Sequence, residues 1–189
     1  MRITGGEARG RPVRVPRAPG LRPTPDRVRQ AVFSKLAPWI QGARVVDLFA
    51  GSGVMGFEAL SRGAASAVFV EQAPRTAAAL AASARDLGYA ERVRVVREDV
   101  FHALPNTIGQ ADADLVFADP PYDRGLAARV VSAVAPLLKP GAWLVLEHSA
   151  REAVPDQVPG VPDFRCVDRR RYGDTVVSYY RRLLEEGPG

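Results

Sequence analysis

Short apolar runs alternate with longer amphipathic segments between residues 44 and 146. Four or five consecutive apolar residues are typical of buried strands, whereas apolar positions that recur every three or four residues are typical of helices. The predicted strands are 45–49, 67–70, 93–96, 115–118 and 143–146, and the predicted helices are 53–61, 74–88, a short one after residue 96, and 126–138. Strands alternating with helices predict βαβ units, and hence a mostly parallel sheet with helices on both faces.

The two ends of the chain depart from this alternation. Residues 1–23 are rich in Gly, Pro and Arg, and they predict a small hairpin or an extended arm. A helix is expected next, with Thr24 as its cap, Pro25 at the first helical position and Asp26 at the positive end of its dipole. Two strand-like runs flank a turn at residues 172–174, and they predict a hairpin with at least one antiparallel strand.

The expected fold class is therefore α/β, with a Rossmann-like, mostly parallel seven-stranded sheet and an antiparallel C-terminal hairpin. We expect residues 1–43 to form a basic arm and helix, and residues 44–189 to form a single compact domain. No apolar run has the length of a membrane span, and the N-terminus does not resemble a signal peptide, so a cytoplasmic protein is expected. The single cysteine, Cys166, excludes a disulfide framework and a cysteine-based zinc cluster.

Basic residues are concentrated at the start of the chain. Residues 1–43 carry a net charge of +7, compared with +5 for the whole protein. A basic arm on a nearly neutral body favours a polyanionic partner such as a nucleic acid. Arginine supplies 24 of the 26 basic residues, a bias that genome composition also explains, so the charge alone leaves the partner open.

A strand that runs into a glycine-rich turn is the most informative stretch. Residues 45–53 are VVDLFAGSG, and a predicted helix follows them. Glycine lets the backbone turn sharply and approach a ligand, and the helix start offers free N–H groups. We therefore predict that Gly51, Ser52 and Gly53 bind a cofactor.

Two cofactors fit a turn of this kind. Residues 51–56, GSGVMG, match the dinucleotide fingerprint, and Glu71 follows at the appropriate distance. Asp47 argues for S-adenosylmethionine, because a carboxylate would repel a pyrophosphate but suits the ammonium group of a methionine moiety. Glu71 is predicted to bind the ribose, and Asp99, with Val100 beside it, the adenine. Each acid alone fits a helix cap or solvated strand end, but three at successive strand ends favour S-adenosylmethionine.

The fourth predicted strand ends in the motif Asp119-Pro120-Pro121-Tyr122. An aromatic amino group is a poor nucleophile, because its lone pair is delocalised into the ring. The Asp119 carboxylate and the Pro120 carbonyl can accept its two hydrogens, and proline restricts the backbone that holds them. Tyr122 can stack on a base, a contact worth about 1–3 kcal/mol in nucleic-acid complexes. These four residues are the predicted catalytic set, and methylation of an exocyclic amino group is the predicted reaction.

Other chemistries lack the residues that they need. No cysteine lies near residues 119–122, so covalent attack on cytosine C5 is not expected. His102 and His148 are isolated in the sequence, and we expect no metal site.

Together these motifs resemble the bacterial small-subunit (16S) ribosomal RNA guanine-N2 methyltransferases, over nearly the whole chain. The glycine turn and the Asp-Pro-Pro-Tyr motif are shared with many amino methyltransferases. The arm and the EALSRGA run narrow the resemblance, which rests on RITGG at 2–6, RPT at 22–24, DRVR at 26–29, EALSRGA at 58–64 and YGDT at 172–175.

The resemblance implies transfer of a methyl group from S-adenosylmethionine to N2 of one guanine in small-subunit ribosomal RNA, with the base turned out of its stack. It also implies that the substrate is RNA already bound by ribosomal proteins in an assembling subunit. The candidate phosphate contacts lie in the arm, in the first helix and near the last hairpin: Arg9, Arg11, Arg22, Arg27, Arg29, Arg169, Arg170 and Arg171.

Four other functions remain open from the sequence. A DNA adenine-N6 methyltransferase can use the same motifs, although 189 residues leave no evident target-recognition domain. A protein glutamine methyltransferase would leave the basic arm without a purpose. A nicotinamide dehydrogenase would lack an evident proton donor, and a non-catalytic RNA-binding module would leave Asp119 and Tyr122 without a role. Binding of S-adenosylmethionine would separate the two methyltransferases from the other two functions.

Overall fold

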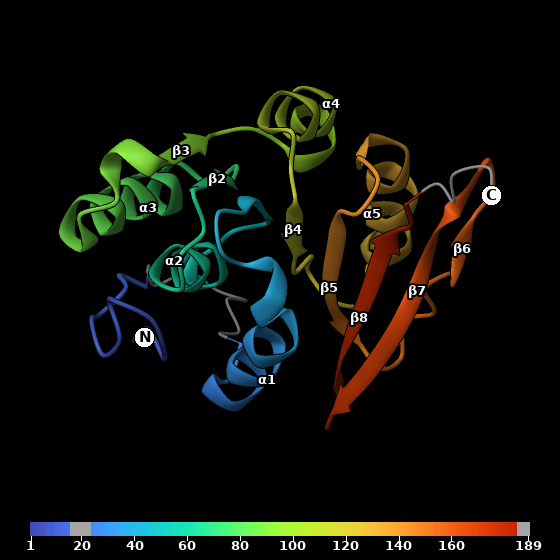
Figure 1. The fold of residues 1–189 in the computed structure, drawn as a ribbon, viewed down its shortest axis with the longest axis horizontal. Helices are drawn as coiled ribbons and strands as arrows, with labels where there is room; N and C mark the ends of the chain where they lie inside the picture. Colours follow the sequence, from blue (N-terminus) through green and yellow to red (C-terminus); the bar gives the residue numbers. More distant parts are fainter. Residues whose placement is uncertain (16–23, 185–189) are drawn as a thin grey trace.

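One mixed sheet organises the computed structural model, which describes residues 1–15 and 24–184 (Figure 1). Its strands in chain order are β1 (Arg44–Leu48), β2 (Ser66–Val70), β3 (Val93–Val96), β4 (Leu115–Ala118), β5 (Trp143–Ser149), β6 (Gln157–Val158), β7 (Val161–Tyr172) and β8 (Thr175–Arg182). Their spatial order is β3-β2-β1-β4-β5-β8-β7-β6. The first five in this order run parallel, and the last three run antiparallel to their neighbours. The predicted α/β class is confirmed.

The described residues form eight strands instead of the expected seven. The additional strand is β6, which has two residues and pairs with the edge of β7. Two residues are too few to produce an alternating pattern, so the sequence carried no signal for it. The predicted hairpin at residues 172–174 is confirmed, since Tyr172 pairs with Thr175.

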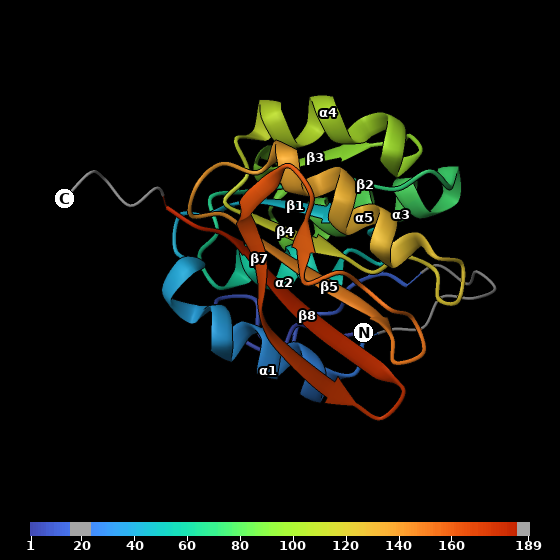
Figure 2. The same cartoon turned by 90° about the vertical axis from the view of Figure 1, so that its right-hand side faces the viewer.

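Helices cover both faces of the sheet. They are α1 (Asp26–Leu36), α2 (Val54–Ser61), α3 (Pro74–Leu87), α4 (Val100–Ala111) and α5 (Leu126–Val134). Figure 2 shows α1 and α2 on the opposite side of the sheet from α4 and α5. Because successive strand residues point to opposite faces, Val45 packs in the core beneath α1, α2 and α3, whereas Val46 and Leu48 pack beneath α4 and α5. None of the helices in the described ranges is long and apolar enough to cross a membrane.

Two helix boundaries differ from the prediction. Pro25 is the N-cap residue of α1, and no side chain caps this helix. The prediction that Thr24 is the cap is wrong, because its hydroxyl instead donates to Glu147 Oε2 at 2.9 Å. The helix expected over residues 126–138 changes to a 3₁₀ turn after Val134, where Pro136 lacks the N–H that would continue the α-helix.

The N-terminal arm folds back on itself and joins the core. Arg2 and Pro12 form an antiparallel bridge, which agrees with the predicted hairpin-like arm. Ile3, Ala8 and Val13 are buried in the core that contains α1 and α2. The arm therefore packs against the sheet domain, on the face that α1 and α2 cover.

Candidate active site

Acidic side chains gather where the parallel strands end. Asp47 lies in β1, Glu71 follows β2, Asp99 follows β3, Asp119 follows β4 and Glu147 lies in β5. The register pairs the last residue of β4 with the residue that precedes Glu147 in β5. The carboxyl edge of an open α/β sheet is the edge at which such folds bind ligands.

The glycine turn between β1 and α2 is held by two of these acids. The Gly51 N–H donates to Glu71 Oε2 at 3.1 Å, and the Gly56 N–H donates to Asp47 Oδ2 at 3.0 Å. Gly51 and Gly53 have φ angles of 53° and 72°, in the left-handed region that favours glycine. Glu71 thus holds the turn itself, and Asp47 holds the first turn of α2 that follows it.

Asp47 is a buried carboxyl group whose side chain is in none of the ion pairs formed by the described residues. Burial raises its pKa from 3.8 to about 8, and the charge of Glu71 adds to this shift, while the Gly56 hydrogen bond opposes it. A buried carboxylate is costly unless a cation or hydrogen-bond donors compensate it. Asp47 therefore fits a ligand that brings its own positive charge.

The third predicted cofactor acid has a structural partner. Asp99 is the N-cap residue of α4, and its Oδ1 accepts from the Phe101 N–H at 2.9 Å and the His102 N–H at 3.4 Å. Asp99 therefore caps a helix, which is the other role that its position in the sequence allowed. Asp99 is exposed and Val100 is buried in the first turn of α4, and their contact with an adenine remains a prediction.

Tyr122 ties the acceptor motif to the neighbouring strands. Its hydroxyl donates to Glu147 Oε1 at 3.0 Å and lies 3.2 Å from Thr175 Oγ1. Burial raises the pKa of Asp119 well above its usual range, and the charges of Glu147 and Asp47 raise it further. The motif thus provides an acceptor carboxyl group and, three residues later, an aromatic ring whose hydroxyl is held by β5 and β8.

Glu147 is a site residue that the sequence analysis missed. Its two carboxylate oxygens accept one hydrogen bond each, from the Thr24 and Tyr122 hydroxyls. Burial raises its pKa, and the two hydrogen bonds oppose that shift. The sequence did carry a signal for Glu147. It directly follows the apolar run 143–146, just as Glu71 directly follows the apolar run 67–70.

A cavity of about 20 Å³ connects the predicted cofactor acid with the acceptor motif. It is lined by Thr24, Val32, Asp47, Met55, Phe117, Ala118, Asp119, Val145, Glu147 and Val177. Three of these side chains are carboxylic acids and none is Lys or Arg. A larger pocket of about 310 Å³ lies between the arm and the end of α3, but it contains none of the predicted catalytic residues. The chemistry of the lining makes the smaller cavity the candidate reaction site.

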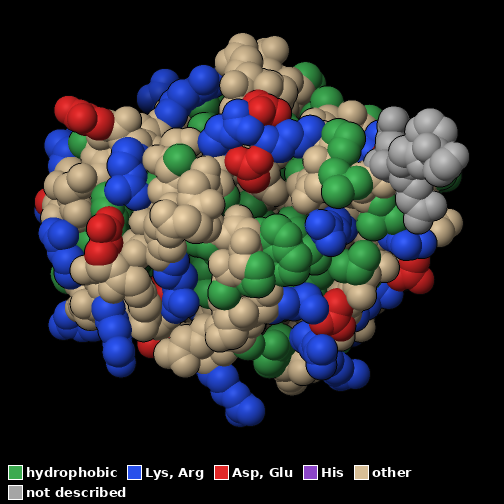
Figure 3. All heavy atoms as spheres, in the orientation of Figure 1, with side chains coloured by type: hydrophobic (Ala, Val, Ile, Leu, Met, Phe, Trp, Pro, Cys, Tyr) green, Lys and Arg blue, Asp and Glu red, His purple; other side chains and the backbone are tan. Residues whose placement is uncertain are grey.

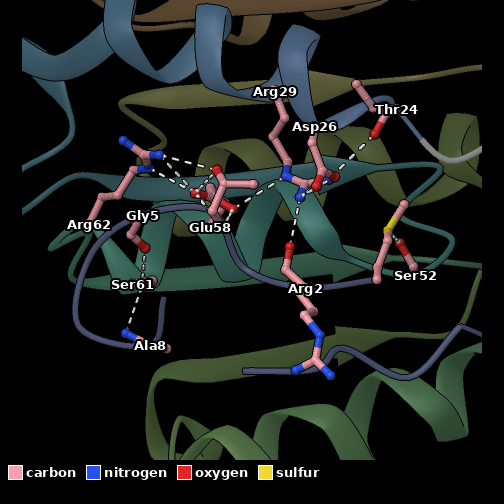
Figure 4. A network of polar contacts seen from close by, with 12 residues as sticks. Arg2, Gly5, Ala8, Thr24, Asp26, Arg29, Ser52, Glu58, Ser61 and Arg62 are labelled. Carbon is pink, nitrogen blue, oxygen red and sulfur yellow. Dashed lines mark hydrogen bonds and ion pairs between the residues drawn. The ribbon is translucent and has the colours of Figure 1, made fainter. Parts of the chain in front are cut away.

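The predicted RNA contact at Arg29 is corrected by the structure. Its side chain is fully buried, and it bonds to Glu58 Oε2 at 3.3 Å, Asp26 Oδ1 at 2.9 Å and the Arg2 carbonyl at 2.7 Å (Figure 4). Glu58 is also fully buried and accepts from Arg62 and from Thr4. Arg29 therefore anchors the arm and α1 to α2, and it is not accessible to RNA.

The other predicted RNA contacts differ in their surroundings. Arg11 donates to the Leu87 carbonyl at 3.0 Å at the end of α3, and Arg169 forms an ion pair with Asp156 at 3.0 Å. Arg22 lies outside the described residues. Apart from Arg29, the six described candidates are all exposed: Arg9, Arg11, Arg27, Arg169, Arg170 and Arg171. Arg170 also forms an ion pair with Asp168 at 2.9 Å, and the Arg171 Nε–H donates to the Gly173 carbonyl at 2.9 Å. Figure 3 shows basic side chains distributed around one face of the molecule, with a hydrophobic area between them.

A metal centre has no support in the part of the chain that the structure describes. Within these ranges, no three His, Cys, Asp or Glu side chains are arranged to hold a metal ion.

The fold and the edge site define the class, which is that of the S-adenosylmethionine-dependent methyltransferases with a Rossmann-like sheet. The chain belongs to the family described as Conserved hypothetical protein 95, whose model matches residues 1–181. It is 37% identical to the Escherichia coli K12 protein named Ribosomal RNA small subunit methyltransferase D, over all of this chain and 92% of that protein.

Solved structures share this fold. A hypothetical protein of Thermus thermophilus superposes with a TM-score of 0.79 at 32% identity, over 95% of this chain and 98% of that chain. An RNA methyltransferase from Salinibacter ruber, solved with S-adenosyl-L-homocysteine, has a TM-score of 0.66 at 21% identity, over 88% of this chain and 97% of that chain. This second likeness concerns the fold alone.

Proposed function

We propose that this protein transfers a methyl group from S-adenosylmethionine to the N2 amino group of a guanine in small-subunit ribosomal RNA. The observation that carries the proposal is that Asp47 and Asp119 line one cavity, at the ends of the adjacent strands β1 and β4. The relative named Ribosomal RNA small subunit methyltransferase D supports the choice of RNA, since it matches the whole chain, including the arm.

S-adenosylmethionine fits the residues at the sheet edge. Asp47 would hold its ammonium group, Glu71 its ribose, and Asp99 with Val100 its adenine, while residues 51–53 bring the backbone close. Its cationic charge would compensate carboxylates that have no Lys or Arg beside them in the cavity. When bound, it supplies an electrophilic methyl group on a positively charged sulfur.

The residues of the acceptor motif hold the amino group of the base in position for methyl transfer. The Asp119 carboxylate and the Pro120 carbonyl accept the two N2 hydrogens, which favours a tetrahedral nitrogen whose lone pair is directed at the methyl carbon. Methylation releases one proton from N2, and the Asp119 carboxylate would accept it within the motif. Tyr122 supports the flipped base by stacking, with its hydroxyl fixed by Glu147.

The substrate form is part of the proposal. We infer that the enzyme acts on RNA already bound by ribosomal proteins, and that Arg9, Arg27, Arg170 and Arg171 contact phosphates. These side chains are exposed in the structure, which such contacts require.

Labelled S-adenosylmethionine tests the proposal on small subunits from a strain that lacks the enzyme, with naked ribosomal RNA, DNA and protein as parallel substrates. We expect label in N2-methylguanosine, a loss of about 100-fold or more in Asp119→Ala, and a smaller loss in Asp119→Asn, which keeps one acceptor oxygen. The control is Asp123→Asn, because Asp123 follows the motif closely and is exposed. Label in N6-methyladenine or in protein would overturn the guanine assignment.

A further inference from the structure

A second, partly buried carboxyl group lies beside the acceptor motif, and the reaction described above leaves it without a contact to substrate. Glu147 and Asp119 line the same cavity, from the adjacent strands β5 and β4. Glu147 is also partly accessible, and each of its oxygens has accepted only one hydrogen bond. A carboxylate oxygen can accept two, so each keeps capacity for a further donor.

The hydrogen-bonding groups next to the reactive nitrogen differ between nucleobases. In guanine, the N2 amino group lies next to N1–H, which is a donor. In adenine and cytosine, the corresponding amino groups lie next to ring nitrogens that only accept. Asp119 and Pro120 contact only the amino group and cannot make this distinction. A second carboxylate beside them can, because it accepts from N1–H but faces a lone pair in the other two bases.

The Tyr122 hydrogen bond places Glu147 where this contact is possible. Its hydroxyl is 3.0 Å from Glu147 Oε1, so a base that stacks on the ring has an edge beside the carboxylate. Thr24 holds the other oxygen at 2.9 Å, which fixes the plane of the carboxyl group. No basic side chain lines the cavity to compete for these oxygens.

We propose that Glu147 is a specificity-determining residue that selects guanine by accepting a hydrogen bond from N1–H. This inference rests on the proposed function, since it presupposes that an exocyclic amino group is methylated in the cavity between Asp47 and Asp119. It explains how the Asp-Pro-Pro-Tyr motif, which serves adenine as well as guanine, can be restricted to one of them.

A base substitution in the RNA tests the inference directly. After the methylated guanine has been mapped, small-subunit RNA is prepared with 2-aminopurine at that position, a base that keeps the amino group but lacks N1–H and O6. The value of kcat/KM for N2 methylation is measured on both substrates with the wild type and with Glu147→Gln. We expect the variant to lose about 10- to 100-fold on guanine, the discrimination that a charged contact to a base edge supplies.

The decisive quantity is the ratio of kcat/KM on 2-aminopurine to kcat/KM on guanine. We expect Glu147→Gln to raise it at least 10-fold, because the glutamine amide can donate to the unprotonated N1. The missing O6 affects both enzymes and cancels in the comparison. A purely structural role for Glu147 would lower both rates by the same factor, and an unchanged ratio would overturn the inference.

Two controls separate the carboxylate from its surroundings. Thr24→Val removes the hydrogen bond that fixes the carboxyl plane but keeps the carboxylate as the acceptor, so its ratio is expected to change much less than that of Glu147→Gln. Glu91→Gln makes the same chemical change at an exposed residue and is expected to change neither rate. Glu91 lies just before β3, the strand at one end of the strand order. Binding of S-adenosylhomocysteine to each variant shows that the site is folded.

The outcomes also distinguish this inference from the proposed function. A wild-type enzyme that methylates no guanine N2 contradicts both. A wild-type enzyme that methylates guanine N2, combined with an unchanged ratio in Glu147→Gln, contradicts only the role of Glu147.

Discussion

Two acidic clusters lie on the same side of the sheet and differ in their partners. In the first, Glu58 is fully buried against Arg29, at 3.3 Å, and Arg62, at 2.9 Å. In the second, Asp47, Asp119 and Glu147 line a cavity with no basic side chain. Arginine side chains compensate the negative charge of the first cluster, whereas no basic side chain in the cavity compensates the second.

This difference indicates which cluster stabilises the fold and which one binds ligands. A buried acid with arginine counterions is satisfied in the folded chain, so the Glu58 cluster serves to attach the arm and α1 to the sheet domain. Acids without counterions have raised pKa values, as at Asp47, and such groups concentrate at sites that bind ligands. The cluster that lacks its own cations is therefore the one that we assign to the cofactor and the base.

Removal of Arg29 has the largest expected effect on stability. Arg29→Ala leaves Glu58 as a buried charge with only Arg62 beside it, so we expect a loss of about 3–5 kcal/mol in the free energy of unfolding. Urea denaturation measures it. Arg27→Ala, at an exposed position two residues earlier, is the control and is expected to change stability by about 0.5 kcal/mol or less. Equal losses in the two variants would remove the basis of the comparison.

The second cluster should make the stability of the protein depend on pH. Between 3.8 and about 8, folded Asp47 holds a proton that the unfolded chain releases, so its contribution to stability falls as pH rises through this window. Asp47→Asn removes the titration. Without cofactor, the variant should therefore gain stability relative to the wild type from pH 5 to pH 8, on the order of a few kcal/mol.

Urea unfolding at the two pH values measures this gain. The matched control is Asp86→Asn, because Arg14 lowers the pKa of exposed Asp86. Asp86 is ionised in both the folded and the unfolded chain across this range, so its variant should show no comparable change. A flat difference for Asp47→Asn would indicate that Asp47 is compensated after all.

A smaller effect is expected at Tyr122. Tyr122→Phe keeps the ring for stacking but removes the hydroxyl that donates to Glu147, so we expect kcat to fall about 10-fold, the magnitude of one hydrogen bond to a charged group. KM for RNA should change little, since the stacking surface remains. Tyr122→Ala, which also loses the ring, should raise KM as well. If both variants behaved alike, the hydroxyl would carry the whole role of the side chain.

The smallest effects concern the exposed arginines, in contrast to buried Arg29. Arg170→Gln and Arg171→Gln should each lower RNA affinity a few-fold and reduce the slope of log K against log salt by about one. Filter binding at several salt concentrations measures the slope. The exposed residue Arg75, on the first turn of α3, offers a control substitution to Gln. An unchanged slope in all three variants would place the RNA elsewhere on the surface.

Much of the fold could be predicted because strand and helix patterns are local. The strands 93–96 and 115–118 coincide with β3 and β4, and the glycine turn lies between β1 and α2 as expected. Asp47, Glu71 and Asp119 reach one edge because parallel strands end together. The prediction for Thr24 failed because a partly buried acid 123 positions away, Glu147, binds the hydroxyl that would otherwise cap the helix.

The sequence by itself determined the alternation of strands and helices, the glycine turn and the acceptor motif, since each depends on neighbouring residues. Only the tertiary structure decided which charges are partnered. Arg27 and Arg29 belong to one short run, yet one is exposed and the other fully buried against Glu58. Likewise, Glu147 joins the site through hydroxyls from Thr24 and Tyr122. The compensation of a charge depends on groups distant in sequence, and folding alone brings them together.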